Sequence, residues 1–388
     1  MTLFWYVFFI FDILWNYNLL VGEINLKRPS IIIKLTTIIL LLFGLLTIYS
    51  SSYVWALYKF GNKYHYLIYQ VIFLFLSLFI YKFVKNINID YLKKKINLFL
   101  FIGIFLLILV VIPGIGVVRN GSRSWFSLGP LSFQPSEFIK IVLIMFTAKY
   151  LEKYHNKINK IKDNLMPIII VLGLIIFLIM LEPDFGSSMI IILTIISMLF
   201  SSGLKYKFFG VIGISGLIGI ALIILVAPYR IARIVSFINP WKDPLGSGYQ
   251  IIQSLYAIGP GGLFGHGLFS SRQKYFYLPE PQTDFIFAIF CEELGIIAAS
   301  FVIILFIILF YNIFVISFKE SDLFKKFLVI GVGSSLAIQT VMNLSVVVGL
   351  VPVTGVTLPF FSYGGSSLLI SIISIALIIN VDDNKNNM

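Results

Sequence analysis

Residues 284–318 read DFIFAIFCEELGIIAASFVIILFIILFYNIFVISF, an almost unbroken apolar run that starts at one acid, Asp284, and encloses two more, Glu292 and Glu293. A helix of about 20 apolar residues crosses a bilayer, and runs of that kind recur along the chain. Hydrophobic residues make up 59% of the 388 residues and charged residues only 12%, which is more apolar surface than a soluble domain of this length can bury. The sequence therefore predicts a polytopic membrane protein.

The predicted fold class is all-α: a polytopic transmembrane helical bundle with ten core helices and irregular extracytoplasmic loops. The ten apolar runs lie near residues 31–52, 66–84, 97–113, 137–151, 166–181, 187–203, 208–227, 285–316, 326–349 and 362–381. An eleventh apolar stretch at 2–21 lacks a basic start and a cleavage site, so a signal peptide is not expected. It is an extra span, an interfacial helix or a non-native upstream start, and we expect a membrane-associated hydrophobic extension over residues 1–30.

The basic residues set the orientation of the bundle. Alternate links carry most of them, namely Lys82, Lys85, Lys93, Lys94, Lys95, Lys153, Lys157, Lys160, Lys162, Lys205, Lys207, Lys319, Lys325 and Lys326. By the positive-inside rule these links are cytoplasmic, as are both ends of the core domain 31–381 and the tail 382–388. The links at 114–136, 228–284 and 350–361 are then outside. Because the net charge of +12 lies largely in such short links, no nucleic-acid partner is expected.

Two of the polar segments on the outer side precede spans. In RNGSRSWFSLGPLSFQPSEFIKI (119–141), Ser136 is placed to cap the next helix, and Glu137 and Lys140 form an i,i+3 pair in its first turns. Ionisable groups within spans are costly, so a functional role is expected for this segment. In LEPDFGSS (181–188), helix capping by the two acids and a functional role are equally good explanations.

The other two outer segments surround the opening run. In RQKYFYLPEPQTDFIFAIFCEELG (272–295), Thr283 or Asp284 can cap the following helix, and Arg272 and Lys274 can bind an anion such as a diphosphate. Glu292 and Glu293 need partners such as Lys140 or a helix end. The segment VPVTGVTLPFFSYGGSSLL (351–369) is irregular, and its Ser366 and Ser367 are explained by close helix packing.

Several kinds of site are not supported by the sequence. The single cysteine, Cys291, excludes an intrachain disulfide, and the three histidines are too far apart to show metal-ligand spacing. The stretch GGLFGHG (261–267) neither follows a strand nor has the spacing of a phosphate loop, so no nucleotide site is predicted.

These segments resemble, in order and spacing, the motifs of the SEDS family of cell-wall proteins (FtsW, RodA and SpoVE). The resemblance covers nearly all of residues 31–381. It is carried by GSRSW…QPSEFIK, PYRIARI…NPWKDPLGSGYQIIQS, RQKYFYLPEPQTDFIFAI…EELG and LVPVTGVTLPFFSYGGSSLL. The motifs YLPEPQTDFIFAI and NPW.DPLGSG are most similar to the FtsW/SpoVE branch, although PVTG also occurs in RodA proteins.

The resemblance implies a peptidoglycan glycosyltransferase in the bacterial cytoplasmic membrane that polymerises lipid II outside. It implies a class B penicillin-binding protein, a transpeptidase, as partner, besides other division or elongation proteins. The essential aspartate of the family falls on Asp284. Further family residues fall on Arg123, Trp125, Gln134, Glu137 and Lys140.

On this reading Asp284 is the base that takes a proton from the acceptor 4-hydroxyl. Candidates for binding the diphosphate are Arg123, Arg230, Arg233, Arg272 and Lys274, while Lys140 orients Glu137. No cofactor is certain; a divalent cation, Mg or Mn, is possible, although no all-protein metal cage is visible. A lipid II flippase or transporter and a non-catalytic scaffold stay open as alternatives, and so does the choice between septation, elongation and sporulation.

Overall fold

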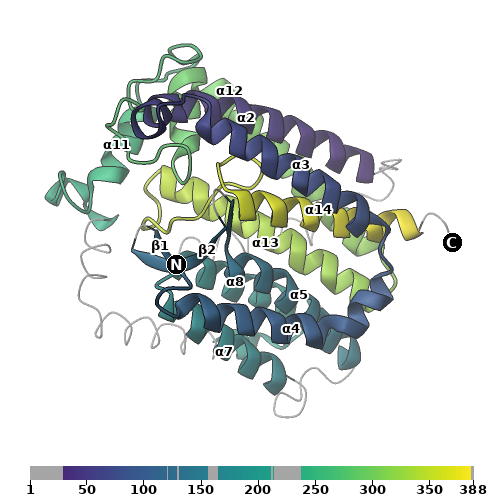
Figure 1. Ribbon diagram of the computed structural model, residues 1–388. Coiled ribbons are helices and arrows are strands. Elements are labelled where there is room, and N and C mark those ends of the chain that lie inside the picture. The colour runs from purple at the N-terminus through teal and green to yellow at the C-terminus, as the bar shows by residue number, and fades with distance from the viewer. Residues whose placement is uncertain are drawn as a thin grey trace.

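The structure, a computed structural model, is a helical bundle and describes residues 29–119, 121–128, 131–155, 165–210, 213 and 237–385 (Figure 1). Its long helices are α2 (Pro29–Phe60), α3 (His65–Asn86), α4 (Ile89–Val111), α5 (Pro135–Lys153), α7 (Met166–Leu181), α8 (Phe185–Ser201), α12 (Ile286–Lys319), α13 (Leu323–Val347) and α14 (Gly365–Lys385). These helices coincide with nine of the ten predicted apolar runs. The remaining span, near 208–227, lies mostly outside the described residues, as do the extension up to residue 28 and the end of the tail.

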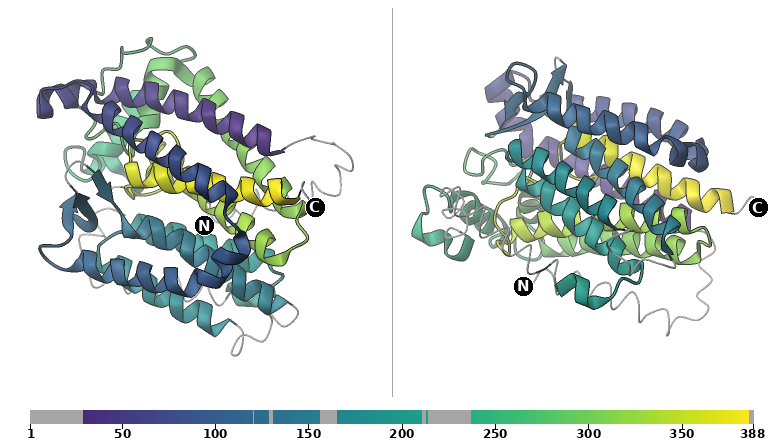
Figure 2. Two further views of the ribbon diagram at one scale, coloured as in Figure 1. Left: turned by 45° about the vertical axis from the view of Figure 1, so that its right-hand side comes forward. Right: turned by 90° about the horizontal axis from the view of Figure 1, so that it is seen from below.

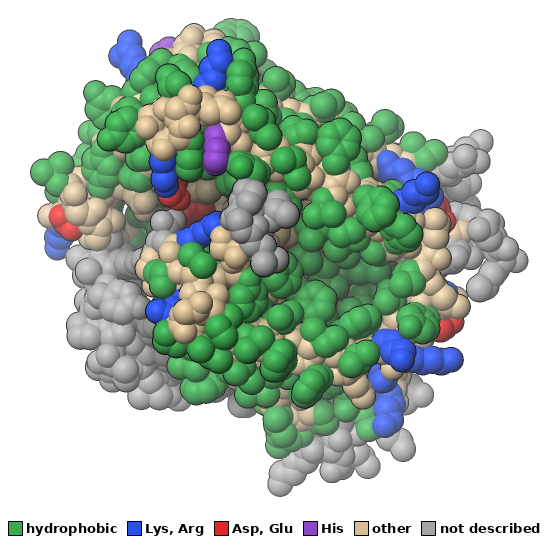
Figure 3. All heavy atoms as spheres, viewed as in Figure 1, with side chains coloured by type: hydrophobic (Ala, Val, Ile, Leu, Met, Phe, Trp, Pro, Cys, Tyr) green, Lys and Arg blue, Asp and Glu red, His purple; other side chains and the backbone are tan. Residues whose placement is uncertain are grey.

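The composition of the helices is that of a multi-pass membrane protein. Among the described helices, α2, α3, α4, α12, α13 and α14 are long and apolar enough to cross a membrane, and α7 and α8 are shorter apolar helices. Large apolar side chains such as Phe75, Phe101 and Ile307 are exposed, and hydrophobic side chains cover most of the face in Figure 3. Because lipid replaces water around such a protein, these exposed side chains are expected on its outer faces.

The helices form two groups joined by α13. In the first, α12 packs on α2, and α14 packs on α3; in the second, α4 packs on α5 and α7, and α7 on α8 (Figure 2). Helix α13 contacts α12 in the first group and α5 and α8 in the second, so it lies in the middle of the bundle. Most of α5 is buried as well, although charged residues lie near both of its ends.

The connections gather at the two ends of the bundle. The start of α2 and the end of α14 lie at one end, while the strands, α11 (Tyr249–Ile258) and the segment before α14 lie at the opposite end, here called the loop end (Figure 1). At the first end, ion pairs join Lys85 to Asp383 at 2.9 Å and Lys93 to Glu152 at 2.6 Å. Helix α14 continues through 382–385, residues that were predicted to belong to the tail.

One link at the loop end differs from the prediction of irregular loops. Residues 117–133 contain three short antiparallel strands in the order β1-β2-β3: β1 (Val117–Arg119), β2 (Ser122–Leu128) and β3 (Leu131–Phe133). Val118 pairs with Arg123, and Phe126 pairs with Phe133. Strands of this length are too short to give a clear alternating pattern in the sequence.

The link 228–284 contains short helices and turns in its described part from residue 237 onward. A 3-10 turn, η2 (Pro240–Lys242), precedes α11, and the Ser254 hydroxyl of α11 donates to the Val347 carbonyl at 2.6 Å. This bond attaches α11 to the end of α13.

Helix α12 is broken at Gly295, whose φ of 74° and ψ of −178° interrupt the helix. The glycine-rich stretch 261–267 fills the break with backbone hydrogen bonds. The amides of His266 and Gly267 donate to the carbonyls of Glu292 and Glu293, while the amide of Ile296 donates to the Gly262 carbonyl. Since unpaired backbone groups are costly inside a membrane, this insertion explains the glycines that superficially resemble a phosphate loop.

Candidate active site

Asp284 lies at the loop end, on the segment that leads into α12. The helix begins at Ile286, and Phe285 occupies the capping position without a side-chain hydrogen bond, so the prediction that Thr283 or Asp284 caps this helix is wrong. The Thr283 hydroxyl instead donates to the Glu280 carbonyl at 2.9 Å. The Asp284 carboxyl therefore does not cap the helix.

The backbone around Asp284 is held by α13. The Asn343 side-chain amide donates to the Asp284 carbonyl at 2.8 Å and to the Val356 carbonyl at 2.7 Å. Gly355, with φ of 73°, lies beside the Asp284 carboxyl. Asn343 thus joins the Asp284 segment to the irregular segment 351–364, and a side chain at position 355 would approach the carboxyl.

The Asp284 side chain is partly buried, and this burial raises its pKa from 3.8 to about 6. The negative charge of Glu280 also raises the pKa, while the neighbouring Thr283 side chain lowers it. The ion pairs that the described residues form do not include Asp284. A carboxylate with a pKa close to neutral is well suited to accept a proton.

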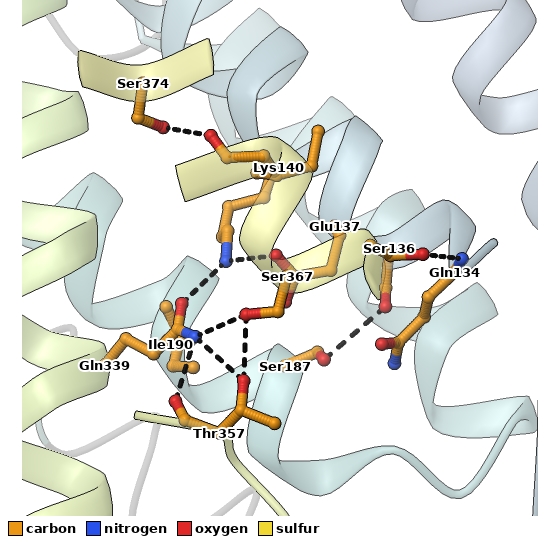
Figure 4. Close-up of polar contacts among 12 residues, drawn as sticks. Gln134, Ser136, Glu137, Lys140, Ser187, Ile190, Gln339, Thr357, Ser367 and Ser374 are labelled. Carbon is orange, nitrogen blue, oxygen red and sulfur yellow. Dashed lines mark hydrogen bonds and ion pairs between the residues drawn. The ribbon is translucent and has the colours of Figure 1, made fainter. Parts of the chain in front are cut away.

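A second polar group surrounds Lys140 on α5 (Figure 4). Its ammonium lies 2.9 Å from a Glu137 oxygen, which confirms the predicted pair, and it also donates to the Gln339 side chain at 2.9 Å. Gln339 in turn donates to the Thr357 carbonyl at 3.1 Å and to the Ser367 hydroxyl at 3.3 Å. Ser367 is therefore part of a hydrogen-bond network, whereas the sequence suggested packing alone.

Gln134 extends this polar region toward α8. Its side-chain amide donates to Asp184 at 2.9 Å, and its backbone amide donates to the Ser366 hydroxyl at 3.1 Å. Asp184 caps α8 by accepting from the Ser187 amide at 3.0 Å, as one of the two explanations predicted. The predicted cap of α5 is wrong: Pro135 begins that helix, so Gln134 occupies the capping position instead of Ser136.

Glu182 lies at the end of α7, and neither of its carboxyl oxygens forms a hydrogen bond with another described residue. It is fully buried, and burial, together with the nearby charge of Asp184, raises its pKa to about 9. Glu182 is therefore protonated and uncharged at neutral pH. This accounts for a buried acid that has no basic partner in the described part of the chain.

Lys274 and Glu293 form a buried ion pair that the sequence did not predict. The Lys274 ammonium lies 2.8 Å from a Glu293 oxygen, and the Ser50 hydroxyl of α2 donates to the same carboxylate at 2.6 Å. Glu292 accepts from the Ser271 hydroxyl at 2.5 Å and from the Arg272 amide at 2.8 Å. The partner of Glu293 is thus Lys274 and not Lys140, because the loop folds back onto the broken part of α12.

The predicted diphosphate ligands differ in their surroundings. Lys274 is fully buried in its ion pair, so its ammonium is not accessible to a ligand in this structure. Arg272 is exposed. Arg123 is partly buried on β2, where one guanidinium nitrogen donates to the Val111 carbonyl at 3.4 Å and the Nε has no partner among the described residues. Arg230 and Arg233 lie outside the described residues.

Trp125, also on β2, is partly buried, and the guanidinium of Arg119 lies 5.4 Å from the centre of its ring. The sheet therefore presents an aromatic ring and two arginines at the loop end. Cation–π contacts of this kind hold a guanidinium in place while leaving its edge free to donate hydrogen bonds.

Sequence reasoning missed Gln339 and Asn343, which connect the two polar regions to the segment before α14. A signal was available, because these two polar residues lie four apart within an apolar span and so face the same side of α13. Polar residues within a span are functional or structural by default. Ser50, in the serine run of α2, carried the same kind of signal.

A metal site is not evident from the donor set. Within the part of the chain that the structure describes, no group of three or more His, Cys, Asp or Glu residues is arranged to hold a metal ion. We therefore assign no step to a metal, and participation of a divalent cation stays a prediction.

Comparison with known proteins agrees with this arrangement. A family model described as "Cell cycle protein", which covers FtsW, RodA and SpoVE, matches residues 31–387. The chain belongs to the FtsW/RodA/SpoVE family. Among the relatives of this family member is Stage V sporulation protein E of Bacillus subtilis, which is 46% identical over 91% of this chain and 96% of its own length. A probable peptidoglycan glycosyltransferase FtsW of Coxiella burnetii is 40% identical over 90% of this chain and 95% of its own length.

Solved structures share the fold. A chain from a study of polymerization and crosslinking by a peptidoglycan synthase complex superposes with a TM-score of 0.76 at 28% identity, covering 92% of this chain and 98% of that one. The rod shape determining protein RodA of Thermus thermophilus superposes with a TM-score of 0.68 at 25% identity, covering 91% and 96%. The predicted membrane bundle and the predicted family are thereby confirmed.

Proposed function

We propose that this protein is a peptidoglycan glycosyltransferase that polymerises lipid II at the outer face of the bacterial cytoplasmic membrane. Two relatives that align over nearly the whole chain carry names from the same cell-wall family, and one is named a probable peptidoglycan glycosyltransferase. The observation that carries the proposal is Asp284: a partly buried carboxyl at the loop end, with a pKa raised to about 6 and with its backbone fixed by Asn343.

In the proposed reaction Asp284 accepts the proton of the acceptor 4-hydroxyl. The acceptor oxygen then forms a bond to the anomeric carbon of the donor sugar, and the bond from that carbon to the diphosphate breaks. The electron pair leaves with undecaprenyl diphosphate, and the anomeric configuration inverts. A base within hydrogen-bonding reach and with a pKa near the working pH is what such a step requires.

The leaving diphosphate needs cationic partners. Arg272, exposed on the segment leading to Asp284, and Arg123, with unused donor capacity on β2, are the described candidates. Arg230 and Arg233 belong to the same proposal from sequence alone. Lys274 is better explained as a structural residue, because its charge is already neutralised by Glu293. Lys140 orients Glu137 and also binds Gln339, and Gln339 in turn holds the segment around Thr357.

We further propose that the loop end faces the outside and that both ends of the core are cytoplasmic, as the distribution of lysines indicates. The proposed partner is a class B penicillin-binding protein, together with other division or elongation proteins. One support is the likeness to a chain studied in a peptidoglycan synthase complex that coordinates polymerization and crosslinking.

The test is polymer formation by the purified protein from lipid II. Asp284→Asn keeps the size and hydrogen-bonding capacity of the side chain but removes the base, and we expect it to lower the rate by roughly 10²–10⁴-fold. Arg272→Gln should lower the rate less, because it removes one of several cations. Polymerisation at the normal rate by Asp284→Asn would refute the assignment.

A transport function is separated by a parallel measurement. Wild type and Asp284→Asn are reconstituted into sealed vesicles, and movement of a labelled lipid II across the bilayer is followed. Movement that requires Asp284, without polymer formation by wild type, would replace the proposed function by that of a flippase. A scaffold would show neither activity, and its cellular role would be unaffected by Asp284→Asn.

A further inference from the structure

The glycine-rich stretch 261–267 runs along α12 past the break at Gly295 and then turns back. Its contacts with α12 follow in chain order: Gly261 lies against the Cys291 carbonyl, the Leu263 carbonyl accepts from the Ile297 amide at 3.3 Å, and the Gly267 amide donates to the Glu293 carbonyl at 2.9 Å. The stretch therefore reaches furthest along α12 at Leu263 and Phe264. We call these two residues the tip.

The tip is apolar and exposed. Leu263 is 61% exposed and Phe264 is 78% exposed, and residues 244–271 around them contain no Asp, Glu, Lys or Arg. Backbone groups of the turn are paired within the protein, among them the Leu263 carbonyl and the Gly265 amide, which donates to the Gly261 carbonyl at 2.7 Å. Irregular backbone is compatible with a hydrocarbon environment when its polar groups are paired in this way.

The surroundings of α12 change at its break. Before Gly295, the residues from Ile286 to Glu293 are all buried, so this part of the helix is enclosed by protein. After the break, large apolar side chains are exposed at helical spacing, namely Ile296, Ile297, Phe301, Ile304 and Ile307. The part from Ile296 to Lys319 is about 36 Å long, which is enough to cross a hydrocarbon core of roughly 30 Å. We therefore expect the contact of α12 with lipid to begin at the break.

Helix α2 indicates the same level for the edge of the hydrocarbon. The Ser50 hydroxyl donates to Glu293, two residues before the break, at 2.6 Å. From Pro29 to Ser50, α2 is about 33 Å long, which again matches the hydrocarbon core. Exposed side chains before Ser50 include Leu35, Ile38, Leu42 and Leu46, whereas those after it include Tyr58, Lys59 and Phe60. A change from aliphatic to aromatic and basic side chains is typical of the membrane interface.

The chain that follows the tip contacts α2 at this level. The ring of Phe269 meets that of Tyr49, the neighbour of Ser50, edge to face with ring centres 5.7 Å apart. The tip precedes Phe269 in the chain and lies beyond the break along α12, beside Ile297. The contacts with both helices thus place the tip on the hydrocarbon side of the expected edge.

We propose that Leu263 and Phe264 insert between the acyl chains of the bilayer leaflet at the loop end. Lipid is the occupant, and not a soluble protein domain, because the tip continues the exposed apolar surface that α12 presents beyond its break. The same loop runs on to Lys274, which is bonded to Glu293, and then to Asp284. Lipid contact at the tip therefore sets the height of this loop relative to the membrane.

The depth of the tip is measured by spin labelling of the purified full-length protein. The single cysteine is removed by Cys291→Ala, and Leu263→Cys or Phe264→Cys is added and labelled with a nitroxide. The labelled protein is reconstituted into vesicles of phosphatidylcholine and phosphatidylglycerol. Power saturation compares collisions with oxygen, which concentrates in hydrocarbon, and with a water-soluble nickel chelate. We expect both labels to be several times more accessible to oxygen than to the chelate.

Two further positions calibrate this measurement. Ile304→Cys, exposed on α12 beyond the break, should show the same preference for oxygen. Leu245→Cys, 88% exposed in the turn that follows Lys242 and Asp243, should be more accessible to the nickel chelate. Thermal unfolding in detergent identifies variants that fail to fold. Because both side chains of the tip are exposed, we expect the tip variants to keep the midpoint of the Cys291→Ala protein, and either label carries the test.

Two results would overturn the proposed lipid contact. Tip labels that respond to the nickel chelate as Leu245→Cys does would show that the tip lies in water, as a docking surface for a soluble partner requires. Tip labels that neither reagent reaches would show that protein covers the tip, and in these vesicles that protein is a second copy of the chain. Polymer formation plays no part in this measurement, so the proposed function is decided separately by Asp284→Asn.

Discussion

Two buried ion pairs at the loop end have almost the same length and different consequences. Lys140 and Glu137 are 2.9 Å apart and belong to one helix, three residues apart. Lys274 and Glu293 are 2.8 Å apart and join a loop to the broken part of α12, where Ser50 of α2 also binds. The first pair adds a local polar centre to a helix that forms without it. The second determines where the loop leading to Asp284 lies.

The difference shows that a lysine beside a proposed active site can be structural. Arg272 and Lys274 are two residues apart and looked equivalent in the sequence, but one is exposed and the other is fully buried against an acid. Removing one partner of a buried ion pair destabilises the protein by more than the intact pair stabilises it, because the remaining charge stays desolvated. The two pairs can therefore be compared by removing one lysine from each.

The largest effect is expected for Lys274→Met. This change leaves Glu293 buried without its cation, and we expect a loss of about 3–5 kcal/mol in the free energy of unfolding. The midpoint of thermal unfolding in detergent measures it. The double variant Lys274→Met/Glu293→Gln should recover most of the loss, since no buried charge is left unpaired. A double variant that is as unstable as the single one would contradict this reading of the pair.

The matched control is the pair at the opposite end of the bundle. Lys85 and Asp383 are 2.9 Å apart, but their side chains are 30% and 35% exposed. Pairs of this kind contribute at most about 1 kcal/mol. Lys85→Met should therefore change the unfolding midpoint little, and an effect as large as that of Lys274→Met would show that burial is not what distinguishes the two.

Gly295→Ala tests the helix break on which the loop and its ion pair depend. A Cβ at this position would meet the backbone of Leu263 and Gly265, and the φ of 74° is unfavourable for any other residue. We expect a loss of about 2–3 kcal/mol, measured by thermal unfolding. In the control Gly173→Ala, within α7, the Cβ would have no heavy atom within 4 Å. That change should be neutral or slightly stabilising.

Lys140→Met should be milder than Lys274→Met, at about 2 kcal/mol. Glu137 lies in the first turn of α5, where the helix dipole stabilises a negative charge even without the lysine. The same thermal unfolding assay compares the two variants directly. Equal destabilisation by both lysine substitutions would show that local and long-range pairs do not differ in the way proposed here.

The sequence was sufficient for the parts of the structure that depend on periodicity and local spacing. The apolar runs located the described spans, and the spacing of Glu137 and Lys140 predicted their pair because residues three apart share a helix face. The cap at Asp184 was one of the two explanations that its position before a span allowed. These features require no knowledge of how distant segments meet.

What the sequence did not show depends on contacts between distant segments. The strands around Arg123 are three to seven residues long and lie among turn residues. The bond between Lys274 and Glu293 exists because the stretch 261–267 fills the break at Gly295 and turns the chain back. Gln339 and Asn343 obtain their roles from segments that follow them in the chain. No local pattern specifies such meetings.

Asp284 is the third acid in this comparison, and unlike Glu137 and Glu293 it takes no part in the ion pairs of the described residues. Its pKa of about 6 means that it is mostly ionised at pH 7 and mostly protonated at pH 5. Because the base must be ionised, kcat/KM for polymerisation should fall about tenfold between these values as the pH decreases. An aspartate with the ordinary pKa of 3.8 would lose little of its activity as a base over this range.

The charge of Glu280 contributes to the raised pKa of Asp284, so Glu280→Gln should move the midpoint of the pH profile to lower pH. A profile that is flat from pH 7 to pH 5 in the wild type would contradict the assignment of Asp284 as a base shifted by its surroundings.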